Sequence, residues 1–266
     1  MPNKGFPTLL SASILVAILF CTTPSFAAIP LYEFIVESQL LGTRKLYVSD
    51  NIARIDCPRE GLTIITKKPF NRVTCFNVSS KRICEADTAA AVKDFRTLGV
   101  LMAEAGEVII QWKPAGKEKV QGIPCEAYKA KVIHTEARPN KADEADWRKY
   151  WVRKDVEVPK SLGDILAAAV GAPNIPGIPQ RLEHFGSEND FDVPFLTRSN
   201  IETKKKTLKV IISTKSKKRI SVTEKFFEIP KGFKVRKDFK KVILNRGGMD
   251  SLKDAGLSPG FLFESK

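Results

Sequence analysis

The sequence predicts an α+β fold in which amphipathic helices pack on an antiparallel sheet. Two stretches, 117–132 and 147–159, alternate between apolar and polar residues and are joined by the polar run 136–146. A period of two is typical of strands with one packed face and one solvated face, so this pair predicts a long hairpin. In two other segments the apolar spacing changes to three and four residues, which is the period of an amphipathic helix.

The N-terminal part of the chain predicts a meander of antiparallel strands. In the first strand, 32–40, Phe34 and Val36 alternate with Glu33 and Glu37. A hairpin-like break at Gly42-Thr43 separates it from the next strand. Later strands are expected at 45–56 and 62–66, and then from residues 71 and 82 onward.

Residues 88–105 predict an amphipathic helix that lies on this sheet. Asp87 and Thr88 are residue types that favour the beginning of a helix, and Gly106 favours its end. The apolar stripe of this helix consists of Val92, Phe95, Leu98, Met102 and Ala105. We expect the stripe to face the sheet, because a surface helix buries its apolar side.

A second, shorter helix is expected at 162–170. Ser161 precedes it and Asp164 follows three residues later, which makes a weak capping box. The tail 171–179 contains too many prolines to continue a helix and predicts an ordered loop. Further strands are expected at 181–185, 199–203, 208–213, 219–227 and 233–235, with a short helix at 250–255.

Residues 1–27 have the composition of a secretory signal peptide. Lys4 gives a positive start, residues 9–20 are almost wholly apolar, and Ala27 ends a small-x-small cleavage site. The apolar run is shorter than a membrane span, so we expect cleavage and an exported, periplasmic or extracellular protein. The alternatives are an uncleaved N-terminal anchor and lipidation at Cys21.

The remaining residues, 28–266, predict one domain with a C-terminal extension at 236–266. Of the 44 Lys and Arg residues, 43 remain after Lys4 is removed, against 30 Asp and Glu residues. A formal charge of +13 outside the cytoplasm indicates an anionic membrane surface or envelope polymer as partner, and not a nucleic acid. The basic patch expected to make this contact consists of Lys215, Lys217, Lys218 and Arg219. The alternative is a solvated hairpin tip that discourages aggregation.

Four cysteines remain after cleavage, and an even number in an exported chain predicts two disulfides. A two-residue turn within 78–81 would place Cys75 directly opposite Cys84 on neighbouring strands. Cys57 would then pair with Cys125 by elimination. A zinc site is the weaker alternative, because the spacings are long and no histidine lies near the cysteines.

No motif for catalysis or cofactor binding occurs in the sequence. His134 and His184 lie in different segments, and there is no Gly-x-Ser-x-Gly elbow, phosphate loop, dinucleotide fingerprint or His-Glu-x-x-His motif. Oxidised cysteines cannot act as nucleophiles. We therefore expect a non-enzymatic protein without a cofactor or metal, and a hydrolase of unrecognised type is the alternative.

Three parts of the chain carry a resemblance. They are the strand Gly122-x-x-Cys125-x-x-Tyr128 with its Trp-Val partner strand, the short strands at 62–66 and 71–83, and the closing stretch 226–233, which reads FFEIPKGF. Together they resemble secreted bacterial domains of the LolA/LolB superfamily of outer-membrane lipoprotein carriers. The resemblance implies an unclosed half-barrel, in which a strongly curved antiparallel sheet carries amphipathic helices on its concave face. It also implies an apolar groove for lipid, acyl chains or lipoprotein.

The resemblance also assigns roles to particular residues. The groove would be lined by Phe34, Val36, Tyr47, Phe95, Leu98, Met102, Ile165 and Leu166. Arg54 stands where the carriers have an arginine that bonds to the lid helix and holds it shut. The alternative is that the same apolar residues form a closed core, and that the chain is a basic envelope-interaction protein without a small-molecule ligand. The strong basic charge and the predicted disulfides both depart from the carriers.

Overall fold

The computed structural model describes residues 28–39, 41–102, 107–134, 146–187, 206–237 and 239–243. The signal peptide, the strand expected at 199–203 and the helix expected at 250–255 lie outside these residues. The strands are β1 (Ile29–Ser38), β2 (Gly42–Val48), β3 (Ile52–Cys57), β4 (Leu62–Lys67), β5 (Arg72–Asn77), β6 (Arg82–Asp87), β7 (Glu107–Val120), β8 (Ile123–His134), β9 (Trp147–Arg153), β10 (Pro179–Ser187), β11 (Lys206–Val222) and β12 (Lys234–Val235). The helices are α1 (Thr88–Met102), α2 (Lys160–Ala169) and α3 (Lys240–Ile243), with short 3-10 turns η1 (Pro58–Glu60) and η3 (Glu224–Phe227).

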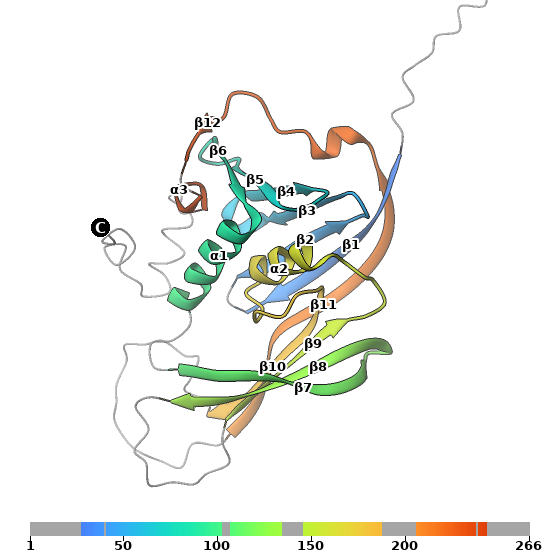
Figure 1. Cartoon of the computed structure of the whole chain (residues 1–266), viewed down its shortest axis with the longest axis vertical. Helices are drawn as coiled ribbons and strands as arrows, with labels where there is room; N and C mark the ends of the chain where they lie inside the picture. The colour runs from blue at the N-terminus through green and yellow to red at the C-terminus, as the bar shows by residue number, and fades with distance from the viewer. Residues whose placement is uncertain are drawn as a thin grey trace, which may run out of the picture.

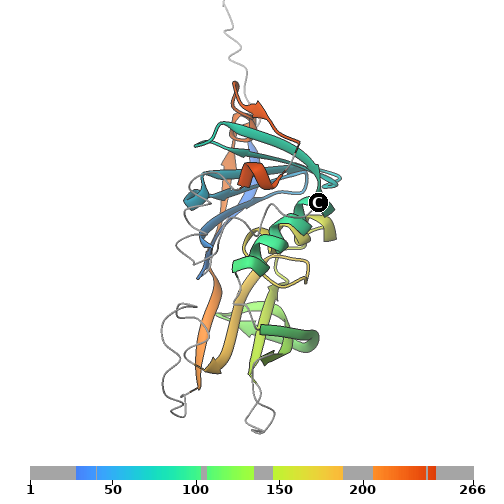
Figure 2. The ribbon, with the colours of Figure 1, turned by 90° about the vertical axis from the view of Figure 1, so that its left-hand side faces the viewer.

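All described strands belong to one sheet, which confirms a sheet-dominated α+β fold. Their order is β12-β6-β5-β4-β3-β2-β1-β11-β10-β9-β8-β7, and the order does not close on itself. Neighbours are antiparallel except for β12, which adds two residues parallel to β6. Figure 1 shows the sheet running from β12 and β6 to β7, with α1 and α2 in front of its middle. The turned view in Figure 2 places both helices on the same side of the sheet.

The predicted meander is confirmed for β1 to β6, each of which pairs with the next. The register is set by alternation, because Phe34 of β1 lies opposite Leu46 of β2, and both side chains are completely buried. Ile55 of β3 and Ile64 of β4 are partners in the same way. These pairs form one face of the sheet and build the core that the helices cover.

The long hairpin predicted from 117–132 and 147–159 is confirmed only in its second half. β8 and β9 pair as antiparallel strands, with Tyr128 opposite Tyr150. The first strand, however, divides at Gln121 and Gly122, whose φ angles of +53° and +78° make a tight turn. Residues before this turn belong to β7, an edge strand that was not predicted. Two positive φ angles in succession suit the two-residue turns that join antiparallel strands.

The two strands expected at 208–213 and 219–227 are one strand in the structure. β11 runs without interruption from Lys206 to Val222 and pairs with β10 along its first part and with β1 along its second part. A register shift between Ile35 and Val36 of β1 absorbs one extra residue of β11. β11 therefore joins the N-terminal meander to the strands β7 to β10.

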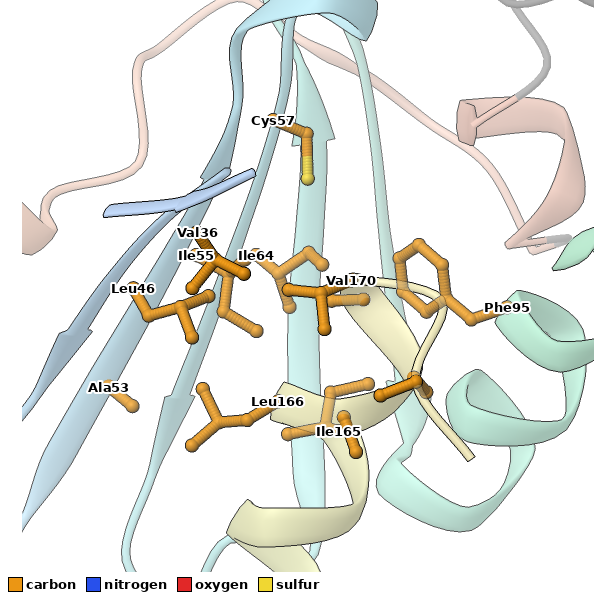
Figure 3. Packing of buried hydrophobic residues seen from close by; sticks show 14 of the residues in the cluster. Val36, Leu46, Ala53, Ile55, Cys57, Ile64, Phe95, Ile165, Leu166 and Val170 are labelled. Atoms are coloured by element: carbon orange, nitrogen blue, oxygen red, sulfur yellow. The ribbon is translucent and has the colours of Figure 1, made fainter. Parts of the chain in front are cut away.

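The two faces of the sheet bury different apolar clusters. The larger cluster contains Phe34, Ile55, Phe95 and Leu166 and lies between the sheet and the helices. Figure 3 shows side chains of α1, α2 and the strands pointing toward one another in this core. A smaller cluster on the opposite face contains Tyr47, Ile65, Phe76 and Phe227, and the chain segment around η3 covers it.

Candidate functional site

The candidate site lies where α1 and α2 run beside each other on one face of the sheet. α1 turns Ala91 and Phe95 toward the core, where they are 0% and 9% exposed. α2 buries Leu162, Ile165 and Leu166 completely. Both helices place their apolar stripe on the sheet and lie side by side. The residues that flank the stripe of α1 therefore face those that flank the stripe of α2. These rows form the walls of a cleft.

The cleft between α1 and α2 has a volume of about 790 Å³. Its walls come from α1, the beginning of α2, the loop after α2, and the chain next to β5 and β6. The lining residues are Asn71, Asp87, Thr88, Ala89, Val92, Lys93, Arg96, Thr97, Ser161, Asp164 and Asn174. Sites of about 300–1,000 Å³ with apolar walls and a few convergent polar groups are typical for small ligands. The cleft therefore has the size of a ligand site, and Ala89 and Val92 are its apolar lining residues.

Arg96 is the polar side chain that distinguishes this cleft. It is partly buried, and its Nε and Nη2 atoms are shielded from solvent and have no hydrogen-bond partner among the described residues. Burial lowers the pKa of Arg96, and the nearby Asp164 carboxylate and Tyr150 oppose that shift. An arginine remains charged throughout the physiological range. The cleft thus contains a cation with unused donors.

Tyr150 adds a second unpaired polar group close to Arg96. Its side chain is completely buried, and its ring packs edge-on against Trp112 at a centroid distance of 6.2 Å. The hydroxyl has no hydrogen-bond partner in the described part of the chain, and burial raises its pKa above the usual value. Buried polar groups are normally satisfied, so unpaired ones near a cleft indicate a place where a ligand group could bond.

The position of α2 is fixed by close contacts at both of its ends. Gly163 lies so near the following loop that a Cβ atom there would meet the backbone nitrogen of Gly177 at 2.4 Å. At the other end, the buried Arg44 donates from Nε to the carbonyl of Ala169 and pairs with Glu60 at 2.7 Å. A cation suits the C-terminus of a helix because of the helix dipole. One wall of the cleft is therefore rigidly placed.

Five of the predicted groove residues come together, but in the core. Phe34, Val36, Ile165 and Leu166 are completely buried, and Phe95 is 9% exposed. Figure 3 shows Val36, Phe95, Ile165 and Leu166 within one packed cluster. None of these five residues lines the cleft between the helices. In this structure they fill the space between sheet and helices, as the closed-core alternative expects.

Of the other three predicted groove residues, Tyr47 is the one whose side chain the structure describes. Tyr47 lies on the opposite face of the sheet, where its ring packs edge-on against Phe226 at 4.8 Å. This corrects its prediction, because alternation along β2 turns Leu46 and Val48 toward the helices instead. The side chains of Leu98 and Met102 lie outside the described part of the chain.

Arg54 also lies on the face opposite the helices, which corrects its predicted bond to the lid. Ala53 and Ile55 face the helices, so the residue between them must point away. Arg54 donates to Asp56 Oδ1 at 2.8 Å and to the carbonyl of Phe226, and its guanidinium lies 4.4 Å from the centre of the Phe226 ring. Arg54 therefore holds η3 on the sheet and does not contact α1.

Both predicted disulfides are wrong, because no disulfide joins the four cysteines described. The predicted register is confirmed, since Cys75 and Cys84 are direct partners on β5 and β6. Residues opposite each other in antiparallel strands have Cβ atoms about 4.5–5.5 Å apart, whereas a relaxed disulfide needs about 3.5–4.5 Å. Cys57 and Cys125 lie on β3 and β8, which five other strands separate. Burial raises the pKa of Cys57 to about 12, so it stays a protonated, inert thiol.

The predicted basic patch lies within β11 and not at a hairpin tip. It consists of Lys215, Lys217, Lys218 and Arg219. Lys217 Nζ donates to Asp155 Oδ2 at 2.8 Å, and Lys215 Nζ lies 3.2 Å from Glu37 Oε2. Two of its four cations are thus paired with carboxylates, which weakens its attraction for another anion. The hairpin-tip alternative fails because β11 is continuous.

The residues of the cleft were missed at the level of sequence. Arg96 follows Val92 and Thr88 at intervals of four residues, so one row of α1 holds all three at the edge of the apolar stripe, to which Val92 itself belongs. The sequence alone shows this row, but it does not show that α2 packs against it.

Among the described residues, no group of three or more His, Cys, Asp and Glu side chains could hold a metal ion. His184 is buried and accepts a hydrogen bond at Nδ1 from Arg148 Nε at 2.9 Å.

Several solved structures match this chain distantly, two of them as follows. No protein family and no curated protein matches the sequence. The crystal structure of an uncharacterized conserved protein from Thermus thermophilus superposes with a TM-score of 0.30 at 11% identity, covering 79% of this chain and 90% of its own. A Vibrio parahaemolyticus domain assigned by name to outer membrane lipoprotein sorting gives 0.21 at 11% identity, covering 72% and 84%. Neither superposition is close enough to establish a common fold, so the resemblance to lipoprotein carriers stays a prediction.

None of the described helices combines the length and the apolar composition that a membrane-crossing helix needs.

Proposed function

We propose that this chain is an exported, non-enzymatic binding protein of the cell envelope. Its ligand is an amphiphile, an acyl chain with an acidic headgroup, and its binding site is the cleft between α1 and α2. The observation that carries this proposal is Arg96, whose buried Nε and Nη2 donors have no partner among the described residues and lie beside the apolar wall formed by Val92. Guanidinium groups bond to carboxylates and phosphates with paired, charge-assisted hydrogen bonds.

In this proposal, α1 acts as a lid on the concave side of a curved sheet. The headgroup bonds to Arg96, and the acyl chain follows Val92 and Ala89 toward the core side of α1. Phe95 already lies at that boundary, because it is buried against Phe239 with ring centroids 5.2 Å apart. The acyl chain comes from a fatty acid, a phospholipid or a lipoprotein, which share this chemistry.

The test is a titration of the protein with a fluorescent fatty acid and with the corresponding fluorescent alcohol. Arg96→Gln should weaken binding of the acid by roughly 10- to 100-fold, since a hydrogen bond to a charged group is worth about 1.5–3 kcal/mol. Binding of the alcohol should change little, because it has no charge to lose. Lys93→Gln is the matched control, since Lys93 lines the same cleft but is exposed.

A second candidate is a basic envelope-interaction protein with a closed core and no small ligand. The complete burial of Phe34, Val36, Ile165 and Leu166 favours it. It predicts that wild-type protein binds neither the acid nor the alcohol, and that native mass spectrometry of protein from its own envelope finds no lipid. Amphiphile binding that Arg96→Gln weakens would support the first candidate. Complete absence of amphiphile binding by the wild type would support the second.

A further inference from the structure

The face of the sheet that points away from the helices carries an aromatic row near one end of β8 to β11. Lys131, Trp147, Phe185 and Leu208 are successive partners across these four strands, so their side chains share a face. The Trp147 and Phe185 rings are stacked with centroids 5.6 Å apart and planes at 17°. Leu208 is 52% exposed. An aromatic pair continued by an exposed leucine makes an apolar strip on the surface.

A row of lysines lies directly beside this strip on the same face. Lys113, Lys129 and Lys149 are successive partners on β7, β8 and β9. Like charges directly opposite each other destabilise a sheet, so this arrangement opposes folding unless an anion is nearby. Lys149 is neutralised by Glu118 at 2.6 Å, and Lys129 Nζ lies 4.9 Å from the centre of the Trp147 ring.

The lysines of the two rows together still carry an excess of positive charge. Lys113, Lys129 and Lys131 are exposed, and none of them forms an ion pair with another residue in the described ranges. Tryptophan and phenylalanine beside lysines form the composition that settles at the boundary between lipid headgroups and acyl chains. A soluble polyanion would use the lysines but would gain nothing from Trp147 and Leu208.

We propose that this surface, formed by Lys113, Lys129, Lys131, Trp147, Phe185 and Leu208, docks the protein on an anionic lipid membrane. The lysines face the headgroups, and Trp147 and Leu208 enter the interfacial layer. The surface is distinct from the cleft, because it lies on the opposite face of the sheet. The proposal therefore goes beyond ligand binding in the cleft and does not require it.

The test is binding of the full protein to vesicles of phosphatidylcholine with and without phosphatidylglycerol, measured by co-sedimentation and tryptophan emission. Wild type should bind only the anionic vesicles, less at high salt, with a blue shift that Trp147→Phe removes. Each lysine near an anionic surface is worth on the order of fivefold in affinity, so Lys113→Gln/Lys129→Gln/Lys131→Gln should lose roughly 100-fold. The matched control, Lys215→Gln/Lys218→Gln/Arg219→Gln, removes the same charge from β11 and should bind nearly as well as wild type.

Three outcomes would overturn the proposal. Equal losses in the two triple variants would mean that binding follows net charge and not this surface. Binding to dextran sulfate without binding to anionic vesicles would identify a soluble polyanion as the partner. Vesicle binding without a change in emission that depends on Trp147 would exclude insertion. Arg96→Gln should bind anionic vesicles as the wild type does. The triple variant Lys113→Gln/Lys129→Gln/Lys131→Gln should keep the fatty-acid affinity of the wild type. The two proposals can therefore fail independently of each other.

Discussion

Gly163→Ala is expected to destabilise the protein although alanine is the better helix former. Gly163 lies inside α2, where replacing glycine by alanine normally gains about 1 kcal/mol. Here the added Cβ would meet the Gly177 nitrogen at 2.4 Å, its Cα at 3.0 Å, and the Pro176 carbonyl carbon at 3.1 Å. These are backbone atoms, so no side-chain rotation relieves the contact.

The loop cannot retreat from the helix to make room. On its other side, a Cβ atom at Gly177 would meet Val152 Cγ1 at 2.3 Å, so this stretch of loop is wedged between α2 and β9. Overpacking a tight interface costs about 1–3 kcal/mol, and a contact with a trapped backbone belongs at the upper end. Subtracting the gain in helix propensity of about 1 kcal/mol leaves a net loss of about 2 kcal/mol. For a chain of this length that lowers Tm by roughly 4–8 °C.

The measurement is urea unfolding of the wild type, Gly163→Ala and Ser161→Ala, followed by circular dichroism. Ser161 belongs to the same helix and lines the cleft, so its substitution changes helix propensity without entering the interface with the loop. Ser161→Ala should be neutral or slightly stabilising. If Gly163→Ala is as stable as Ser161→Ala, the close packing of α2 on the loop is refuted, and with it the rigid wall of the cleft.

Two further predictions concern Asp155, in the loop that follows β9, and Tyr150, a buried residue of β9. Burial alone would raise the pKa of Asp155, but hydrogen bonds from Arg153 and Lys217 hold it below the usual value. Asp155→Asn should therefore lower stability by about 1 kcal/mol at neutral pH, because it leaves the buried Arg153 without its counterion, while the exposure of Asp155 keeps the loss below that of a fully buried pair. This difference from wild type should persist above about pH 3.9 and vanish as pH falls through the lower folded pKa, as pH-dependent urea unfolding would show. Tyr150→Phe should raise stability by about 1 kcal/mol, since it removes a buried hydroxyl without a partner among the described residues. Tyr128→Phe loses a hydrogen bond to Glu126 and should lower stability. If Tyr150→Phe and Tyr128→Phe change the free energy of unfolding in the same direction, this reasoning is contradicted.

The sequence was informative where alternation or helical spacing persists over several residues. The strand meander up to β6, the two main helices and the pairing of β8 with β9 all follow from such patterns. The register of Cys75 with Cys84 followed from a short turn, because the loop length fixes which residues are opposite. These are local properties, and each depends on neighbouring segments only.

The errors arose where an inference needed information about distance between segments. Elimination paired Cys57 with Cys125, although chain order says nothing about the five strands between them. The lysines at 215–219 look like a turn in the sequence, but β11 continues because β1 pairs with it on one side and accommodates a bulge. Arg54 was assigned by position to the lid, whereas a shift of one residue in alternation decides which face a side chain occupies.

The cleft was missed for the same physical reason. Its walls come from residues that lie far apart in the sequence, such as Arg96 and Asp164, and only the packing of α2 on the sheet brings them together. Arg96 in the sequence is one more charged residue beside an apolar stripe. Its buried, unpaired donors are a property of the assembled fold.

Strand β9 connects the two proposed surfaces and determines how they can influence each other. Tyr150 points toward the helices and lies near Arg96, whereas Trp147 and Lys149 point to the opposite face. Alternate residues of a strand project to opposite faces, so a substitution on one face leaves the side chains of the other in place. Effects of well-separated substitutions usually add within about 0.5 kcal/mol. Ligand binding in the cleft and docking on the outer surface should therefore be energetically independent. Any coupling between them would require β9 to shift its register or its backbone against β8 and β10.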